Sequence, residues 1–229
     1  MITAELKGSS IVIIGHFNPA MFHPFWFEKN GIITKEEAEL AISRKDDFQM
    51  ILSNPLTVFR TEELFVRIEE NRIQIDAVNN ILTILKDFVV KTFRVLYSNE
   101  VKSFGYNYAT HFRLDSLEMY QEIGDKLAPK KYWGMLLGND VKGTERKGGL
   151  TQLKMTEMKP DNKGSVLMEV APSIRIRPCG LYIACNDHYN LKKEEQDGQF
   201  LASFISNTFD ERMNYLENLQ KELIERLIK

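Results

Sequence analysis

The sequence contains little cysteine: Cys179 and Cys185 are the only two among 229 residues. A disulfide framework that stabilises a secreted domain would need more cysteines, and these two are not spaced as a C-x-x-C motif. Both lie in apolar stretches of the sequence. We therefore expect two free thiols that are buried or half-buried.

The sequence also lacks a long apolar run. No stretch approaches the roughly 20 residues that a membrane-spanning helix requires. The run Ile11–Ile14 is too short for the apolar region of a signal peptide, and the charged residues Glu5 and Lys7 precede it. These features predict a cytoplasmic protein that does not enter a membrane.

Neither sign of charge is in excess. The 30 lysines and arginines are offset by 32 aspartates and glutamates, which gives a formal net charge of −2. A strongly basic nucleic-acid-binding protein is therefore not supported. Apolar residues make up 43% of the chain, which excludes a disordered protein and is enough to build a core.

The common catalytic and cofactor-binding motifs are missing as well. The sequence has no G-x-S-x-G, H-E-x-x-H, dinucleotide-binding or EF-hand pattern. We therefore expect no cofactor and no metal. The sequence identifies no catalytic residue, and it favours a protein that is not an enzyme.

The sequence does contain one order of elements that occurs twice: a strand, a helix, three strands and a helix. In the first half, residues 1–100, strands are expected at 11–17, 48–53, 64–69 and 72–77, a possible short strand at 56–61, and helices at 35–44 and 79–97. In the second half, residues 101–229, strands are expected at 102–113, 150–158, 165–170 and 181–187, and helices at 115–127 and 197–228. Sequence identity between the halves is negligible, so a chance agreement in element order stays open.

Two such halves can pair edge to edge, which removes one exposed edge from each sheet. The expected fold is α+β: one compact unit with a curved antiparallel sheet of about eight strands and long helices on its convex side. This arrangement is similar to helix-grip and TATA-binding-protein-like folds. A likeness in architecture does not carry a function with it.

The strand alternation predicts which side chains face away from the helices. On the strand at 102–113 they are Asn107, His111 and Arg113, and on the strand at 72–77 they include Gln74 and Asp76. Such a face is polar and carries both signs of charge. Duplex DNA would require an excess of basic side chains to neutralise its phosphates. A solvated face and a protein-binding face remain as the two alternatives.

Residues 16–27 combine two histidines, two prolines, one tryptophan and four phenylalanines. His16 and His23 are seven residues apart, which is not a spacing of known metal ligands, and no cysteine is near. One interpretation is a loop that fills the core with aromatic rings. The other is a ligand pocket or a partner-binding loop built on Trp26.

Residues 186–189 place a carboxylate beside an imidazole, which suggests acid–base chemistry. Adjacent residues on a strand point to opposite faces, so Asp187 and His188 would not orient each other as members of a catalytic triad. If a site exists, His188 and Tyr189 belong to it. His16 and His111 occupy matching places in the two halves and would approach each other across a central strand pair.

Another group of residues resembles a known pattern. Gly105, Asn107, the triplet His111–Arg113, the segment 124–130 and Trp133 are similar to a G-x-N…HFR…GD-x-LAPK…W pattern in uncharacterised bacterial proteins of about this length. The resemblance covers mainly the start of the second half. It implies a bacterial cytoplasmic protein and no catalytic residue.

The expected C-terminal helix carries Leu216, Leu219, Leu223 and Leu227 at spacings close to a heptad repeat. Two heptads are too few to indicate a coiled coil. The helix either packs across the whole sheet or serves for self-association or for docking to a partner.

These features favour a non-enzymatic interaction or adaptor subunit of a bacterial cytoplasmic complex. The alternative is a small-molecule-binding protein or an enzyme with a histidine-rich and aromatic pocket between the halves. The candidate binding residues are His16, His23, Trp26, Asn107, His111, Arg113, His188 and Tyr189.

Overall fold

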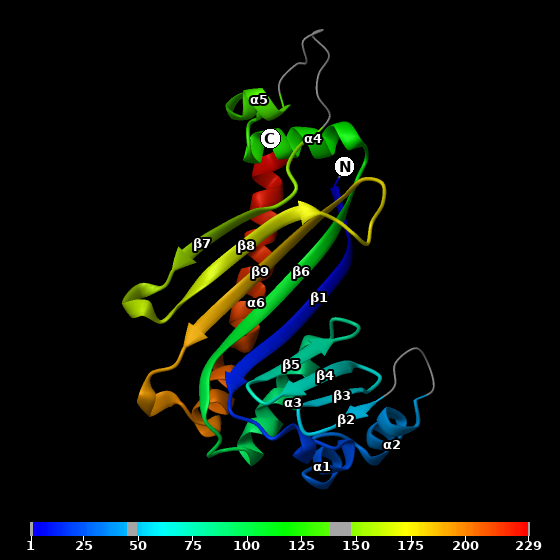
Figure 1. Cartoon of the computed structure of the whole chain (residues 1–229), viewed down its shortest axis with the longest axis vertical. Helices are drawn as coiled ribbons and strands as arrows, with labels where there is room; N and C mark the ends of the chain where they lie inside the picture. Colours follow the sequence, from blue (N-terminus) through cyan, green and yellow to red (C-terminus); the bar gives the residue numbers. More distant parts are fainter. Residues whose placement is uncertain (1, 45–49, 138–147, 229) are drawn as a thin grey trace.

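Figure 1 shows a computed structural model of the chain, which describes residues 2–44, 50–137 and 148–228. The described residues form an antiparallel sheet of nine strands in the order β2-β3-β4-β5-β1-β6-β9-β8-β7. The strands are β1 (Ile2–Gly15), β2 (Ile51–Leu52), β3 (Leu56–Arg60), β4 (Leu64–Glu69), β5 (Arg72–Ala77), β6 (Val101–Leu114), β7 (Leu153–Met158), β8 (Gly164–Pro172) and β9 (Gly180–Asn190). The predicted α+β class with one antiparallel sheet is confirmed, with nine strands rather than about eight.

The helices are α1 (Pro24–Lys29), α2 (Lys35–Ser43), α3 (Leu82–Val95), α4 (Leu117–Leu127), α5 (Gly134–Leu137) and α6 (Gly198–Ile228). Short 3-10 turns lie at Pro19–Met21, Lys130–Trp133, Pro160–Asn162 and Lys193–Glu195. Across the described ranges, we find no helix whose length and apolar character together would let it span a bilayer.

The centre of the sheet is the pair β1 and β6, which runs from Ile2 opposite Leu114 to Gly15 opposite Val101. From β1 the sheet continues outward through β5, β4 and β3, and from β6 through β9, β8 and β7. The sequence predicted a first strand only at 11–17. The strand begins much earlier because residues 2–10 also pair with β6, although most of them are exposed and show no apolar pattern.

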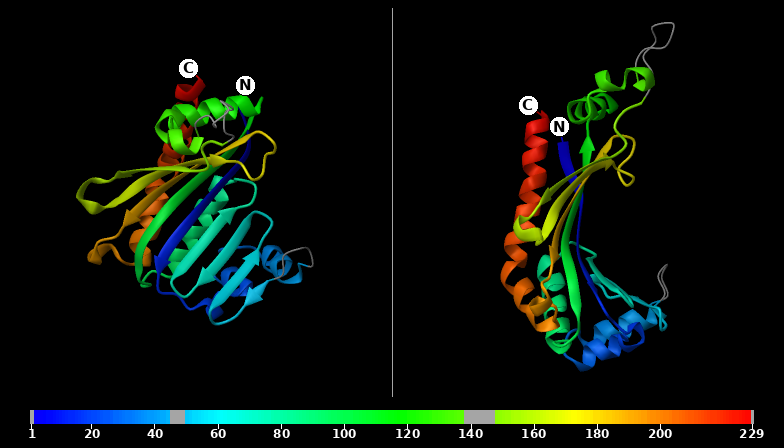
Figure 2. Two further views of the ribbon diagram at one scale, coloured as in Figure 1. Left: turned by 45° about the horizontal axis from the view of Figure 1, so that its top comes forward. Right: turned by 60° about the vertical axis from the view of Figure 1, so that its left-hand side comes forward.

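The sheet is curved, and α3 and α6 cover its convex face (Figure 2). The 31 residues of α6 extend over about 46 Å at 1.5 Å per residue, which is enough to cross the sheet. Its buried side chains recur every three or four residues along the whole helix: Leu201, Ile205, Phe209, Met213, Leu216, Gln220, Ile224 and Leu227. In the part of the chain that is described, no helix crosses the middle of the concave face.

The four leucines near the end of α6 therefore pack against the rest of the molecule. Leu216 and Leu227 belong to the buried stripe, and Leu219 and Leu223 pack partly buried beside it. This is the first of the two alternatives that the sequence left open. Self-association through α6 stays a prediction, and it would have to use the opposite, charged side of the helix.

Local signals in the sequence set several of the helix ends. Thr34 accepts a hydrogen bond from the backbone N–H of Glu37, and the Glu37 carboxylate accepts one from the backbone N–H of Thr34, so the two residues form a capping box at the start of α2. Ser116 caps α4 by accepting a hydrogen bond from the backbone N–H of Met119. Asn79 and Asn80 are of a residue type that often caps helices, but neither caps α3. Ile81 precedes the helix, and Asn80 has a φ of 55°, a left-handed conformation that belongs to the turn after β5.

The aromatic segment 16–27 fills the core. Phe17, Phe22 and Phe27 are buried, and the ring of Phe27 stacks on Phe88 of α3 at a centroid distance of 5.0 Å. The strand expected at 48–53 falls partly outside the described residues, and β2 covers its last part. These packed rings fix α1 and α2 at one end of the sheet and leave the concave face uncovered.

Candidate functional site

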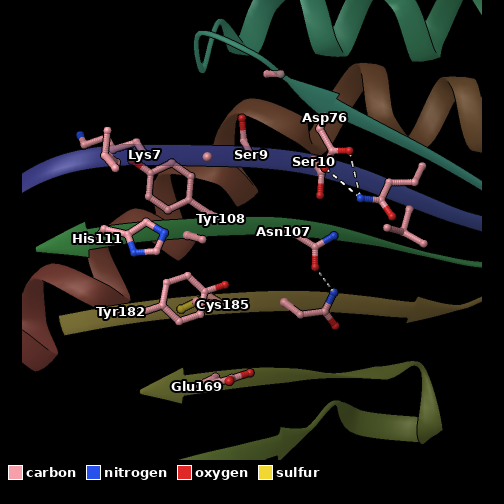
Figure 3. Close-up of a pocket in the computed structure, with 18 of the residues that line it drawn as sticks. Lys7, Ser9, Ser10, Asp76, Asn107, Tyr108, His111, Glu169, Tyr182 and Cys185 are labelled. Atoms are coloured by element: carbon pink, nitrogen blue, oxygen red, sulfur yellow. Dashed lines mark hydrogen bonds between the residues drawn. The ribbon is translucent and has the colours of Figure 1, made fainter. Parts of the chain in front are cut away.

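The concave face of the sheet contains a groove of about 840 Å³, which we call the concave groove. Figure 3 shows it from above, with β5, β1, β6, β9 and β8 side by side. It is lined by side chains of these strands and by Arg175 in the loop between β8 and β9. Because α3 and α6 lie on the other face, this surface is open to a partner.

The floor of the groove is a row of small residues. Gly8 on β1 lies opposite Ala109 on β6, and Ala109 lies opposite Ala184 on β9. Glu169 on β8 ends the row. Neighbouring strands are about 4.8 Å apart, so the small residues make a trough that runs across the strands for about 10 Å.

One wall of the trough is polar. Asp76, Ser10, Asn107 and Asn186 stand opposite one another on four adjacent strands. Asn186 donates a hydrogen bond of 2.7 Å to the side-chain oxygen of Asn107, and Gln74 donates to both oxygens of Asp76 at 2.9 and 3.0 Å. Burial raises the pKa of the Asp76 carboxyl above its usual range, against the effect of these hydrogen bonds.

The other wall contains His111 and Tyr182, which lie opposite each other on β6 and β9 with ring centroids 4.8 Å apart. Nδ1 of His111 is 2.8 Å from the hydroxyl oxygen of Ser173. Burial and then the charge of Arg175 lower the pKa of His111, which favours its neutral form.

The pair of Ser173 and His111 is not arranged as a nucleophile and its base. The Ser173 oxygen accepts hydrogen bonds from the backbone N–H groups of Arg175 at 3.2 Å and Ile176 at 2.9 Å. With both lone pairs used, its hydroxyl donates to His111, and the side chain is only 7% exposed. The hydroxyl therefore holds the β8–β9 loop and orients the imidazole.

Cys185 does not offer a nucleophile either. Both Cys179 and Cys185 are free thiols, as the sequence predicted. Burial raises the pKa of the Cys185 thiol to about 11, so it is protonated at neutral pH. Cys185 is a packed core residue rather than a reactive one.

The groove carries both signs of charge. Asp76 and Glu169 stand on its two sides, and Arg72 and Arg175 provide the positive charge. Glu169 is 3.3 Å from Lys154 of β7. This is the mixed-sign surface that strand alternation predicts.

The structure brings only two of the predicted binding residues into the groove, Asn107 and His111. Arg113 lies farther along β6 and forms an ion pair with Glu5. His188 lies on the same face near the end of β9, and its Nε2 is 3.0 Å from the side-chain oxygen of Asn190.

The remaining predicted residues lie elsewhere. His16 is 2.6 Å from Glu100, His23 caps α1 by accepting from the N–H of Phe25, and Trp26 packs edge-on against Phe22. Tyr189 points to the helix side of the sheet and stacks on Phe104 at 5.0 Å.

The expected approach of His16 to His111 was wrong. His111 lies opposite Leu6, whereas His16 follows Gly15 at the other end of the same strand. At about 3.3 Å per residue, the two histidines are about 30 Å apart along the sheet. Because β1 and β6 are antiparallel, matching places near the ends of the two strands fall at opposite edges of the groove.

Sequence reasoning also missed a buried charged cluster on the helix side. Asp187 is 0% exposed, and its carboxylate lies 2.5 Å from Nζ of Lys159 and 2.6 Å from Nε of Arg212. One signal was present: Asp187 follows Leu181, Ile183 and Cys185 in the same register, and a carboxylate in an apolar register requires cationic partners. Adjacent residues do point to opposite faces here, as the sequence predicted for Asp187 and His188.

Among the described residues, no three histidine, cysteine, aspartate or glutamate side chains gather as a metal site would require. Comparison with known proteins adds no function, because no protein-family model and no curated protein matches the sequence.

Proposed function

We propose that the chain is a protein-binding module whose concave groove receives an extended segment of a partner protein. The observation that carries this proposal is the trough of Gly8, Ala109 and Ala184 between two polar walls on an uncovered sheet face. Small side chains at the floor allow a partner's backbone to approach closely. The walls supply hydrogen-bonding groups within reach of that backbone.

The width of the trough favours an extended segment over a helix. Its walls stand at Asn107 and His111, four residues apart on β6, which is about 13 Å between Cα atoms. A helix with its side chains measures about 10–12 Å across and would need nearly the whole gap, into which the wall side chains project. An extended chain is narrower, and it exposes its own backbone donors and acceptors to the walls.

The chemistry of the walls favours a protein over a nucleic acid. Asn107 and Asn186 offer donors as well as acceptors, which suits a peptide backbone. A phosphate backbone would face Asp76 on one side and Glu169 on the other. A partner segment with one acidic and one basic side chain would complement Arg175 and Asp76.

This proposal assigns the chain the role of an interaction or adaptor subunit. The resemblance of residues 105–133 to bacterial proteins supports a bacterial cytoplasmic complex as the setting. Nothing in the groove requires a chemical step. Several of the polar groups that line it form hydrogen bonds with one another, as Asn107 and Asn186 do.

The test is a substitution that fills the trough without disturbing the core. Ala109→Arg places a long side chain over the floor, and Asn214→Arg on the exposed surface of α6 is the matched control. Each variant is used to isolate partners from the source cells, and the captured protein is then purified and titrated. We expect wild type and Asn214→Arg to bind it equally, and Ala109→Arg to lose at least tenfold in affinity at an unchanged melting temperature. The proposal would be overturned if Ala109→Arg bound the partner as tightly as wild type. It would also be overturned if wild type and both variants were each recovered as a monomer with no partner.

A further inference from the structure

A second cavity lies on the helix side of the sheet, where the β7–β8 hairpin leans over the first half of α6 (Figure 2). It measures about 510 Å³, within the range of small-molecule sites. We call it the helix-side pocket. Its main lining residues are Lys159, Tyr189, Phe200, Phe204, Arg212 and Tyr215.

The floor of the helix-side pocket has more positive than negative charge. Lys159 and Arg212 both contact Asp187, so two cations share one carboxylate. The Asp187 carboxylate also accepts a hydrogen bond of 3.0 Å from the hydroxyl of Tyr189. Burial lowers the pKa of Lys159, although the charge and the hydrogen bond of Asp187 favour its charged form.

Lys159 has little capacity left for a ligand. Besides Asp187, its ammonium donates to the backbone oxygen of His188 at 2.9 Å and lies 3.0 Å from the centre of the Tyr189 ring. Arg212 differs, because only its Nε is engaged by Asp187. Within the described ranges, its two terminal nitrogens have no acceptor, and the side chain lines the pocket at 22% exposure.

The walls of the helix-side pocket are aromatic. The rings of Phe200 and Phe204 have centroids 5.9 Å apart, and the guanidinium of Arg212 lies 4.3 Å over the ring of Tyr215. All three rings are half-buried. Lys159 and Phe104 both cover the ring of Tyr189, and Arg212 covers one face of Tyr215. The aromatic surface left for a ligand is therefore that of Phe200, Phe204 and the rest of Tyr215.

We propose that the helix-side pocket binds a small aromatic carboxylate. The ligand's ring lies against Phe200, Phe204 and Tyr215, and its carboxylate accepts two hydrogen bonds from the terminal nitrogens of Arg212. A planar guanidinium fork matches a planar carboxylate in this bidentate way. The ligand would supply the negative charge that balances the second cation of the floor.

The rim of the pocket limits the charge of the ligand. Glu157, Glu195 and Lys163 also line the pocket, and Glu157 and Lys163 are exposed. Polyanions such as nucleotides would be repelled there, because their further charges would lie near these two carboxylates. A single carboxylate reaches the floor and leaves only its apolar body at the rim.

The test uses three probes of one shape and different charge: 2-naphthoate, 2-naphthamide and 2-naphthylmethylammonium, titrated by calorimetry into the full chain. We expect 2-naphthoate to bind at least about tenfold more tightly than the amide, as for a charge-assisted bidentate pair, and the ammonium compound to bind most weakly. Equal or tighter binding of the ammonium compound would overturn the proposal, as would the failure of 2-naphthoate to bind at millimolar concentration.

Two variants locate the site. Arg212→Lys keeps a cation beside Asp187 but loses the fork, so we expect the affinity for 2-naphthoate to fall about tenfold and that for the amide to stay. Phe200→Ala should weaken all three probes and leave their order unchanged, and it tests the site if Arg212→Lys does not fold. Arg175→Gln in the concave groove is the control and should leave the affinity for all three probes unchanged. Unchanged 2-naphthoate binding in the Phe200→Ala variant would place the probe elsewhere and refute the assignment.

Discussion

The charged cluster around Asp187 should be the most sensitive point of the fold. Asp187→Asn keeps the size of the side chain and removes only its charge. Lys159 and Arg212 then remain side by side with no carboxylate between them. Both cations would then be largely shielded from solvent, since the side chain of Lys159 is 15% exposed and that of Arg212 is 22% exposed.

Removal of one partner from a buried ion pair costs about 3–5 kcal/mol. The two cations of this cluster keep some contact with solvent, so we expect the lower end, about 3 kcal/mol. For a chain of 150–250 residues, 1 kcal/mol corresponds to about 2–4 °C in melting temperature. Asp187→Asn should therefore melt about 6–12 °C below wild type.

Thermal unfolding followed by circular dichroism at pH 7 measures this difference. The matched control is Asp210→Asn, the same substitution at an exposed carboxylate: Asp210 is 65% exposed and lies 2.6 Å from Lys86. Such a pair contributes about 0–1 kcal/mol, so the control should melt within a few degrees of wild type. Adding Lys159→Met to Asp187→Asn should recover part of the loss, because one unpaired cation is then gone. If Asp187→Asn melts no lower than Asp210→Asn, the cluster is not a buried network and the reasoning fails.

Three further predictions concern stability. Burial raises the folded-state pKa of Asp76, so the charged carboxylate lowers the stability of the fold at pH values above that pKa, and this effect is absent below the ordinary aspartate pKa. Asp76→Asn should therefore raise the melting temperature at pH 7. A gain that persists at pH 3 would contradict this. Ser173→Ala leaves two backbone N–H groups without their acceptor and should cost about 1–3 kcal/mol in urea unfolding, whereas an unchanged midpoint would refute the role given to this hydroxyl. A Cβ at Gly198 would lie 2.1 Å from the backbone oxygen of Leu96, so Gly198→Ala should lower the melting temperature, and Gly134→Ala, with nothing within 4 Å, should not.

Much of the fold is local enough to be predicted from the sequence. The hairpin of β4 and β5 was predicted at its observed bounds, because apolar and polar residues alternate along both strands and a turn residue separates them. The first turns of α2 and α4 follow from capping residues. By contrast, β1 between Ile2 and Ser10 has no local signal, since only its pairing with β6 forms it.

The candidate sites divide in the same way. Alternation predicted that Asn107 and His111 face away from the helices, and both line the concave groove. It did not predict the trough, because the row of Gly8, Ala109 and Ala184 depends on the register between strands. That register is set partly by an irregularity in β1 between Ala4 and Leu6, which no single-strand pattern reveals.

The two candidate sites share β9, and its alternation separates them. Ala184 and Asn186 face the concave groove, whereas Tyr189 lines the helix-side pocket and Asp187 is buried on the same side as Tyr189. The sheet is one residue thick, so a shift of β9 by one residue would exchange the two sets of side chains. Asp187 opposes such a shift, because the shift would move its carboxylate away from Lys159 and Arg212. The buried cluster therefore stabilises the register on which the concave groove depends. Arg212→Lys keeps a cation beside Asp187, so peptide binding in the groove should be unchanged in that variant. Asp187→Asn removes the carboxylate, so peptide binding should weaken.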